Sequence, residues 1–444
     1  MGKAVLVAGL GFGDEGKGSI TDFIVRQTGS KLVCRYNGGA QASHAVVEDG
    51  RDHRFSQFGS GTFAGARTFL SRFMLFNPIA LVPEARHLIE IGVPDPYKLL
   101  TIEEGAMLTT PFHVAANRIR EMARDRRHHG SCGMGIGETV AYAWAHRDAI
   151  PFAQDLKEPA KLHEKCALLA QRLKTELASL YDPTRPEMQG EWDVLDDFEG
   201  TMSILQPYAE RVAKHVAIVG PEWLDDELMK DQTVVFEGAQ GVLLDENYGF
   251  HPHTTWSTTT YEWAERLVRR VKGVETKRVG VLRPYMTRHG AGPFVTEDPS
   301  IPVPEGEHNT AGRWQESFRM GHFDAVMARY ALDVCGGVDE LALTCIDHLP
   351  NGGSGIKAAW EYFGPDSRHS RLPVNELDPG WMPGPELDEH LAKQEKLGKQ
   401  LKAMKPVFDE TSGLHAFIDR VSAELKTPVK ILSYGPTASL KVAK

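Results

Sequence analysis

The sequence predicts an α/β fold built around one large, mostly parallel sheet. Short β-rich runs recur along the chain, and segments with helical spacing of apolar residues lie between them. This alternation is typical of parallel sheets, because the helices that connect parallel strands pack on the sheet faces. Polar, glycine-rich segments follow several of the runs, as ligand-binding segments do at the carboxyl ends of such strands. No internal boundary is convincing, so we expect a single domain spanning residues 1–444.

The expected strands are short runs of apolar residues at 4–8, 31–36, 233–236, 341–344 and 429–432. One helix is expected to start within Ser19–Val25. A second is expected over Phe323–Leu332, where apolar residues recur three and four positions apart. The Lys- and Glu-rich stretch 152–224 is predicted to form surface helices. The Gly- and Pro-rich stretch 350–385 is predicted to be irregular.

The composition limits the class of protein. The chain has 444 residues, of which 41% are hydrophobic, enough to bury a large core. Its formal net charge of −10 argues against a general surface for nucleic acids or acidic membranes. The five scattered cysteines suit a reducing cytosol, and no apolar run approaches membrane-spanning length. We therefore expect a cytoplasmic protein without nucleic-acid or membrane partners, in which an anionic substrate needs a local basic pocket.

The most informative segment is Gly11–Gly18, between the first expected strand and the first expected helix. Glycines let successive backbone N–H groups point at one anion, and Lys17 adds a positive charge. The spacing matches the usual phosphate loop, except that Gly18 stands where a Ser or Thr would bind magnesium. Asp14 and Glu15 lie inside this cradle. A carboxylate beside phosphate oxygens is repelled unless a metal intervenes or the group takes part in the chemistry.

Three further segments carry groups suited to binding or catalysis. Tyr36–Ala45 lies at the end of the second expected strand, and its His44 can accept or donate a proton near neutral pH. Gly130–Gly137 combines a hydroxyl, a thiol and glycine amides that can hold a phosphate or a polar ring. Glu237–Gly241 follows another strand, and Gln240 offers both a donor and an acceptor to a nucleobase edge. Taken alone, a structural histidine and a ligand-free loop remain equally open interpretations.

Two more candidates lie in the second half of the chain. Arg313 and Arg319 carry guanidinium groups, whose paired N–H bonds match the two oxygens of a carboxylate. Asp347 follows an expected strand and can accept from the ring N–H and the exocyclic amine of guanine, a donor pair that adenine lacks. Surface arginines are common, and an aspartate at a strand end can equally cap the next turn. These residues by themselves leave both interpretations open.

Together and in this order, the segments resemble the adenylosuccinate synthetase family over essentially the whole chain. The strongest matches are Gly13–Gly18, Glu237–Gly241, Gly290–Phe294 and the segment Gly321–Val326. This family joins aspartate to the purine of inosine monophosphate (IMP), using GTP and magnesium. The resemblance therefore implies a ligase with a purine nucleoside monophosphate, L-aspartate and GTP as substrates, Mg²⁺ as cofactor, and a homodimeric assembly.

The resemblance also implies catalytic roles. Asp14 would remove the N1 proton of the purine and ligate magnesium, with Ser43 as a second ligand. His44 would assist as the 6-oxygen attacks the γ-phosphate, and Lys17 would stabilise the transferring phosphoryl group. The resulting 6-phosphoryl intermediate would then lose phosphate to the aspartate amine.

The implied binding residues fall into three groups. Those for the triphosphate are Gly13, Glu15, Gly16, Lys17, Gly18, Ser43, Asp347, Ser433 and Gly435. Those for the acceptor nucleotide are Asp14, Gln41, Cys132, Arg147, Gln240 and Thr255. Those for aspartate are Thr310, Arg313 and Arg319.

Several positions depart from the family pattern, mostly around the acceptor nucleotide. Gln41 replaces an Asn, Cys132 a Thr, Met134 an Arg, His289 a Val and Cys345 a Lys, while His146 and Arg147 share the place of an arginine that reaches the partner subunit. Two alternatives follow. One is a related ligase with another acceptor, such as deoxyguanylate or a nucleoside-antibiotic intermediate, another amine, or ATP. The other is a non-catalytic nucleotide-binding regulator, which the retention of both an acid and a base in the cradle disfavours.

Overall fold

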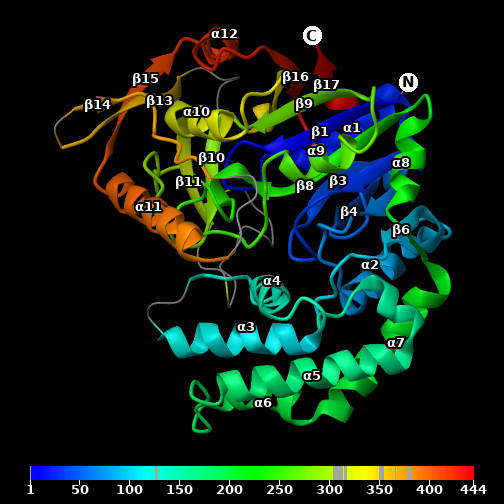
Figure 1. The fold of residues 1–444 in the computed structure, drawn as a ribbon. Coiled ribbons are helices and arrows are strands. Elements are labelled where there is room, and N and C mark those ends of the chain that lie inside the picture. Colours follow the sequence, from blue (N-terminus) through cyan, green and yellow to red (C-terminus); the bar gives the residue numbers. More distant parts are fainter. Residues whose placement is uncertain are drawn as a thin grey trace.

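A computed structural model describes residues 2–125, 129–303, 314, 318–349, 355–365, 367–377 and 383–444. Its centre is a ten-stranded sheet in the order β17-β16-β12-β9-β1-β8-β2-β5-β6-β7 (Figure 1). Every neighbouring pair is parallel except β16 with β17. The prediction of an α/β fold around a mostly parallel sheet is confirmed.

The strands of this sheet are β1 (Lys3–Gly9), β2 (Leu32–Arg35), β5 (Arg67–Leu70), β6 (Leu100–Glu103), β7 (Ala217–Val219), β8 (Thr233–Gly241), β9 (Glu275–Leu282), β12 (Glu340–Leu343), β16 (Val429–Ser433) and β17 (Lys441–Ala443). β1 lies between β8 and β9, with Val5 opposite Val235 and Lys277. After Lys3, every residue of β1 is buried. A strand covered on both faces needs such a continuous apolar run, and this explains why the run was recognisable in the sequence.

A smaller second sheet contains β10 (Tyr285–His289), β11 (Phe318–Asp324), β13 (Ile356–Phe363), β14 (Arg368–His369) and β15 (Lys405–Thr411), and β3 (His44–Glu48) and β4 (Arg51–Phe55) form a hairpin. Two predictions were wrong here. Residues 356–363 are not irregular, because β13 pairs with β11, β14 and β15. The helix expected from Phe323 starts later, because Asp324 ends β11 and its side chain caps the helix by accepting from the N–H of Met327 at 3.0 Å.

The longer helices are α1 (Lys17–Thr28), α2 (Pro78–Glu90), α3 (Pro111–Arg124), α4 (Ile136–Ala145), α5 (Pro159–Leu177), α6 (Pro186–Asp196), α7 (Phe198–His215), α8 (Glu222–Met229), α9 (Glu262–Val268), α10 (Ala325–Val334), α11 (Pro385–Leu401) and α12 (Leu414–Glu424). Helices α5, α6 and α7 lie with α3 at one end of the molecule (Figure 1). They share buried apolar residues such as Leu169, Leu173 and Leu205. Most of the stretch 152–224 is therefore helical as predicted, but Ala217–Val219 form the edge strand β7, and the helices enclose their own core rather than lying only on the surface.

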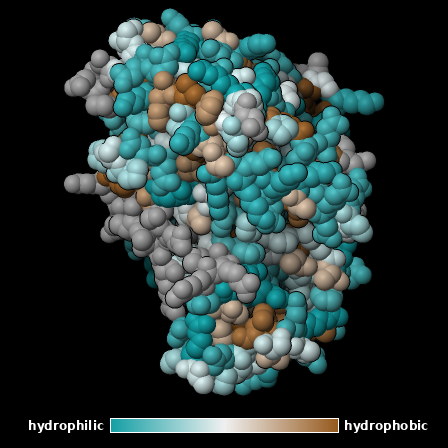
Figure 2. Space-filling view, turned by 90° about the vertical axis from the view of Figure 1, so that its left-hand side faces the viewer, coloured by the Kyte–Doolittle hydropathy of each residue, from teal (hydrophilic) through white to brown (hydrophobic). Residues whose placement is uncertain are grey.

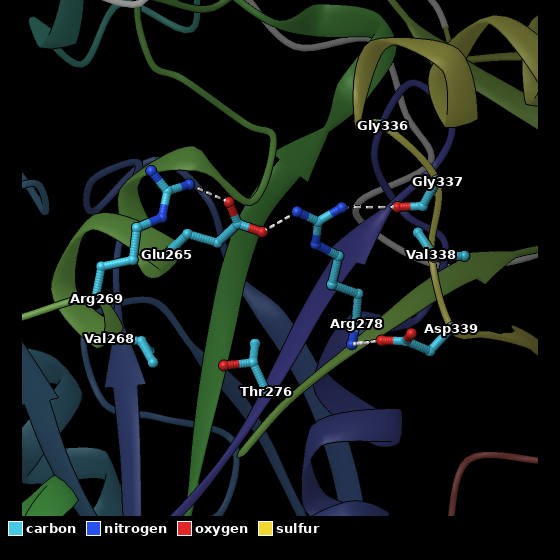
Figure 3. A pocket seen from close by; sticks show the side chains of 9 residues that line it. All are labelled: Glu265, Val268, Arg269, Thr276, Arg278, Gly336, Gly337, Val338 and Asp339. Carbon is cyan, nitrogen blue, oxygen red and sulfur yellow. Dashed lines mark hydrogen bonds and ion pairs between the residues drawn. The ribbon is translucent and has the colours of Figure 1, made fainter. Parts of the chain in front are cut away.

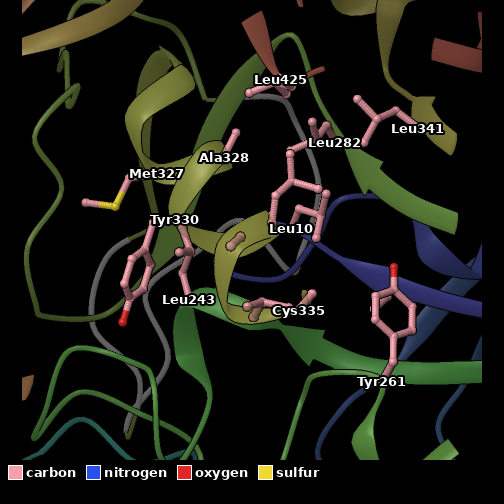
Figure 4. Close-up of a cluster of buried hydrophobic side chains, with 14 of the residues drawn as sticks. Leu10, Leu243, Tyr261, Leu282, Met327, Ala328, Tyr330, Cys335, Leu341 and Leu425 are labelled. Carbon is pink, nitrogen blue, oxygen red and sulfur yellow. The ribbon is translucent and has the colours of Figure 1, made fainter. Parts of the chain in front are cut away.

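A second apolar cluster anchors the strands on the other side of β1. Leu10, Leu282 and Leu341 pack there with Met327 and Tyr330 of α10 (Figure 4). The ring of Tyr330 is buried and its hydroxyl donates to the carbonyl of Tyr248 at 2.7 Å. Because this cluster holds the carboxyl ends of β1 and β9 in place, it fixes the bases of the loops that follow these strands.

The outer surface has no large apolar region on the face that Figure 2 presents. Hydrophilic residues dominate this face, and hydrophobic ones form small, separate patches. Among the described helices, none has both the length and the apolar character needed to cross a membrane.

A buried carboxylate fixes the chain between β4 and the strands of the main sheet. Glu84 of α2 accepts the backbone N–H groups of Ser56, Gln57 and Phe58 at 2.8 to 3.2 Å. An unpaired buried N–H costs about 1–3 kcal/mol, so Glu84→Ala should lower the free energy of unfolding by about 3 kcal/mol or more, measured by denaturant titration. Arg86→Ala, on an exposed position of the same helix, is the control. A Glu84→Ala loss no larger than the control's would contradict this role.

Candidate functional site

The candidate site lies where the central parallel strands end. The segments after β1, β2, β8, β9, β12 and β16 start at the same edge of the sheet, because these strands run side by side in one direction. In the register of the sheet, Gly9 at the end of β1 is opposite Gly241 of β8 and Val281 of β9. This edge is where ligands bind in open α/β sheets.

The turn from β1 to α1 has the backbone of an anion-binding loop. Gly13 and Gly16 adopt φ angles of +96° and +84°, a region open to glycine. Gly16 also caps α1, so the first free N–H groups of the helix face the loop. Asp14 has a φ of +59°, which is uncommon for a residue with a side chain and occurs more often at functional sites.

Gly18 is explained by packing rather than by metal binding. A Cβ atom at Gly18 would lie 2.5 Å from Cβ of His44 and 2.9 Å from Oγ of Ser60. The first turn of α1 therefore contacts β3 directly. A Ser or Thr at this position would push His44 away from the loop.

A buried ion pair fills the loop. Nζ of Lys17 donates to Oε2 of Glu15 at 2.8 Å, and the N–H of Gly13 donates to Oε1 of Glu15 at 2.7 Å. Gly9 leaves the room for this carboxylate, since a Cβ there would lie 2.0 Å from Oε2 of Glu15. The hydroxyl of Thr344, just after β12, donates to the Glu15 carbonyl at 2.5 Å. Glu15 thus occupies the position of an anion in the loop, and a phosphate must compete with it for Lys17.

Asp14 lies at the mouth of the loop, with 42% of its side chain exposed. Nε2 of His289, the last residue of β10, donates to Oδ2 of Asp14 at 3.0 Å. Burial of the carboxyl would raise the pKa of Asp14, but the His289 hydrogen bond and the charges of Arg283 and Lys17 outweigh it and hold the pKa well below its usual range. Asp14 is therefore ionised at neutral pH and can ligate a cation.

His44 is held by a carboxylate that the sequence interpretation left without a role. Nδ1 of His44 donates to Oε1 of buried Glu237 at 2.6 Å, and Glu237 also accepts the N–H of Ser60 at 2.9 Å and the Ser60 hydroxyl. Burial would raise the pKa of Glu237, but the bonds from His44 and Ser60 and the charge of Arg35 lower it to about 2. The sequence did carry a signal for Glu237, which is an acidic residue inside an otherwise apolar strand.

The state of the His44 ring follows from this contact. Burial lowers the pKa of His44 by more than Glu237 raises it, so the free imidazole is neutral. The carboxylate of Glu237 fixes the proton on Nδ1, since an ionised carboxylate only accepts. Nε2 is buried and has no hydrogen-bond partner in the described part of the chain. It is therefore available to a substrate.

The segments expected to bind the acceptor nucleotide are held together by side-chain bonds. Asn37 accepts the N–H of Ala239 at 2.7 Å and donates to the carbonyl of Thr258 at 2.9 Å. The N–H of Gly38 donates to Oγ of Ser257 at 2.9 Å. The loop after β2, the end of β8 and the hydroxyl-rich run after it therefore form one wall of the site.

Three predicted acceptor residues lie on this wall. Gln240, the residue before the end of β8, has a φ of +55°, and its side-chain oxygen is buried without a partner among the described residues. The same holds for both amide atoms of Gln41. Unsatisfied amides are unusual in folded proteins and suit a site that a ligand completes. Thr255 is positioned by its backbone N–H, which donates to the carbonyl of Leu244 at 2.8 Å.

The other two predicted acceptor residues flank α4. Cys132 lies in the turn before the helix, and burial raises the pKa of its thiol, which keeps it protonated. Arg147 lies just beyond the helix and is exposed. The rings of Trp144 and Trp256 lie 5.2 Å apart and bring α4 next to the hydroxyl-rich run. A contact of Arg147 with a second subunit stays a prediction.

The residues expected to read the base of the triphosphate come from adjacent strands. Leu343 of β12 is paired with Leu432 of β16. Asp347 lies in the short turn after β12 and is exposed, and Ser433 ends β16 with its hydroxyl donating to the carbonyl of Gly435 at 3.0 Å. The two segments therefore lie side by side at one end of the site.

Of the three predicted aspartate ligands, only Arg319 is among the described residues; Thr310 and Arg313 lie outside them. Arg319 donates to the carbonyls of Gly290 and Gly292 at 2.8 to 3.1 Å and to Glu297 at 2.8 Å. Arg319 braces the turn at 290–292.

The side chains near the loop suit Mg²⁺ that is bound partly by water and substrate, rather than a metal site made entirely of protein ligands. Within the described ranges, no group of three or more His, Cys, Asp or Glu side chains is arranged to hold a metal. Mg²⁺ commonly takes only one or two carboxylates and completes its shell with water and substrate phosphates. The exposed carboxylate of Asp14 and the exposed hydroxyl of Ser43 suit that mode.

A cavity of about 510 Å³ lies elsewhere, near the amino-terminal ends of β9 and β12 (Figure 3). Its charged groups are paired with each other. Arg278 bonds to Glu265, and its N–H donates to Asp339 at 2.6 Å, while Arg269 donates to Glu265 at 2.5 Å. This cavity is at the opposite end of the strands from the loop, and its satisfied charges do not indicate a ligand.

Comparisons with known proteins agree on one family. The sequence model of the adenylosuccinate synthetase family matches residues 6–441. The adenylosuccinate synthetase of Vibrio parahaemolyticus serotype O3:K6 is 30% identical, with 100% of this chain and 99% of the relative covered, and that of Magnetococcus marinus is 28% identical, with 98% and 97% covered.

Two solved structures share the fold. The fully ligated adenylosuccinate synthetase from Plasmodium falciparum superposes with a TM-score of 0.73 at 21% identity, over 99% of both chains. The succinoaminodeoxyadenylate synthetase of cyanophage S-2L, bound to dGMP and dATP, gives a TM-score of 0.58 at 15% identity, over 100% of this chain and 95% of its own. With the family model covering nearly the whole sequence, the chain belongs to the adenylosuccinate synthetase family of GTP-dependent carbon–nitrogen ligases.

Proposed function

We propose that this chain joins L-aspartate to C6 of IMP, coupled to conversion of GTP to GDP and phosphate. The observation that carries the proposal is the ionised Asp14 at the mouth of an amide-lined loop, with the free Nε2 of His44 on the adjoining strand. A carboxylate in that position is unfavourable for a site that only binds phosphate. It is required in a site that must also deprotonate the acceptor.

The chemistry explains why a phosphoryl transfer precedes the new bond. Oxygen on the purine ring is a poor leaving group. When Asp14 takes the N1 proton, the 6-oxygen gains negative charge and attacks the γ-phosphorus, and the bond to the β-phosphate oxygen breaks, releasing GDP. The aspartate amine then attacks C6, phosphate leaves with the former 6-oxygen, and the amine loses a proton.

The residues of the loop serve the phosphoryl transfer through position and charge. Lys17 and the N–H groups at the start of α1 stabilise the charge on the transferring phosphoryl group. When bound through Asp14 and Ser43, Mg²⁺ would supply further charge neutralisation at the phosphates. The approach of these anions would raise the pKa of His44, since a nearby negative charge favours the imidazolium. A protonated Nε2 can then donate to the developing negative charge.

The family and one protein of similar structure bear on the assembly and on the alternative substrates. We propose a homodimer in which Arg147 approaches the partner's acceptor site. The cyanophage enzyme was solved with dGMP and with dATP as energy donor. Because His289 and Gln41 alter the acceptor side of this chain, dGMP and ATP belong in any test of its substrates.

The direct test offers purified protein IMP, GMP, dGMP or xanthosine monophosphate, each with aspartate, Mg²⁺ and either GTP or ATP. We expect the succinyl adduct of IMP, detected by mass spectrometry, with one GDP and one phosphate formed per adduct. Asp14→Asn keeps the shape but cannot accept the N1 proton, so adduct formation should fall at least about 100-fold. If an adduct formed only from dGMP, the acceptor would be dGMP rather than IMP. Tight nucleotide binding without any adduct would favour a regulator.

Glu237 should affect turnover rather than binding. Glu237→Gln can present an N–H to Nδ1 of His44, which would favour the opposite tautomer and remove the negative charge beside the ring. We expect kcat to fall by about 100-fold or more while KM for GTP changes little. Glu104→Gln, at an exposed position, is the control. An unchanged kcat, or a rise in KM alone, would argue against a positioning role.

A further inference from the structure

One face of β10 lines the candidate site along its length. Side chains alternate along a strand, so Tyr285, Thr287 and His289 share a face. At one end, the Tyr285 hydroxyl lies 2.8 Å from Nδ1 of His348, in the turn expected to contact the nucleotide base. At the other end, His289 donates to Asp14. This face therefore runs from the base end of the site to the phosphoryl-transfer end.

Arg283 lies against the middle of this face. It follows β9 directly, at the strand end beside the loop. Its Nη1 donates to Oγ1 of Thr287 at 3.4 Å, and its guanidinium carbon lies 5.5 Å from the centroid of the Tyr285 ring. Val281, two residues before Arg283, is opposite Gly9 at the start of the loop, and the N–H of Leu10 donates to the carbonyl of Val281 at 3.0 Å.

The guanidinium of Arg283 has unused hydrogen-bonding capacity. Its Nε is buried and has no partner among the described residues, and the bond to Thr287 is long. The nearby carboxylates are already engaged, since Glu15 accepts from Lys17 and Asp14 accepts from His289. A half-buried cation with unmet donors is costly unless an anion completes it.

We propose that Arg283 binds the polyphosphate chain of the nucleoside triphosphate, between the base end of the site and Asp14. A guanidinium can donate to two phosphate oxygens at once. Lys17 is held by Glu15, so Arg283 offers the approaching phosphates a less engaged positive group. The inference rests on the proposed function only for the identity of the nucleotide.

The test compares the affinities of GTP, GDP and GMP by titration calorimetry with Mg²⁺, without aspartate or acceptor, and includes ATP. A charge-assisted hydrogen bond contributes about 1.5–3 kcal/mol, so Arg283→Gln should weaken GTP binding by about 10–100-fold. Binding of GMP, which lacks the β- and γ-phosphates, should change by less than about threefold. Arg283→Lys should recover part of the loss. Arg269→Gln, an exposed arginine, is the control, and thermal unfolding checks the fold of each variant.

The outcomes separate this proposal from the alternatives. An equal loss for GTP, GDP and GMP would mean that Arg283 only supports the site, and would overturn the proposal. An Arg283→Gln variant with unchanged affinity for GTP but a raised KM for the acceptor would also overturn it. So would a wild-type protein that binds neither GTP nor ATP. Because the titration needs no turnover, a wild-type protein that binds GTP but forms no adduct would defeat the proposed function alone.

Discussion

The parallel pairing of β1 between β8 and β9 is the constraint on which the site depends. It brings the loop that carries Asp14 and the strand end that precedes Arg283 to one edge of the sheet, beside β8, whose middle residue Glu237 is opposite Val7 of β1. None of these segments is near another in sequence. The apolar clusters that bury the two faces of β1 therefore determine the geometry of groups that themselves contribute little to the core.

Positive and negative side chains pair with one another throughout the site. Lys17 is matched by Glu15 and His289 by Asp14, while Glu237 lies between His44 and buried Arg35. Each pairing limits the cost of burying a charge, and each also leaves a particular atom available to a substrate. In an acidic protein, this local arrangement supplies the positive potential that a triphosphate and a nucleoside monophosphate require.

The sequence was sufficient for five strands of the main sheet, β1, β2, β8, β12 and β16, because fully buried parallel strands leave continuous apolar runs. It also singled out Asp14, Lys17 and His44 as candidates, because their segments carry their own chemical signature; their roles stay predictions. It could not identify the contact of His289 with Asp14 or the position of Ser60, since both depend on distant segments meeting. The early start assigned to α10 failed because Phe323, which belongs to β11, continues the helical spacing of apolar residues.

Gly18 illustrates the same limit. In the sequence, this residue was a departure from the usual phosphate loop, since it stands where a Ser or Thr would bind magnesium. In the structure, it is the space into which His44 packs. A single residue type therefore had two physical explanations, and only the neighbouring strand distinguished them.

The proposed mechanism requires that the 6-oxygen of the acceptor leaves as one of the oxygens of inorganic phosphate. The most direct measurement uses IMP labelled with oxygen-18 at the 6-position, with unlabelled water, aspartate and GTP, and determines by mass spectrometry where the label goes. We expect each released inorganic phosphate to carry the label. Unlabelled phosphate, formed together with the succinyl adduct, would show that water rather than the purine oxygen attacks the γ-phosphorus, and would contradict the role assigned to Asp14.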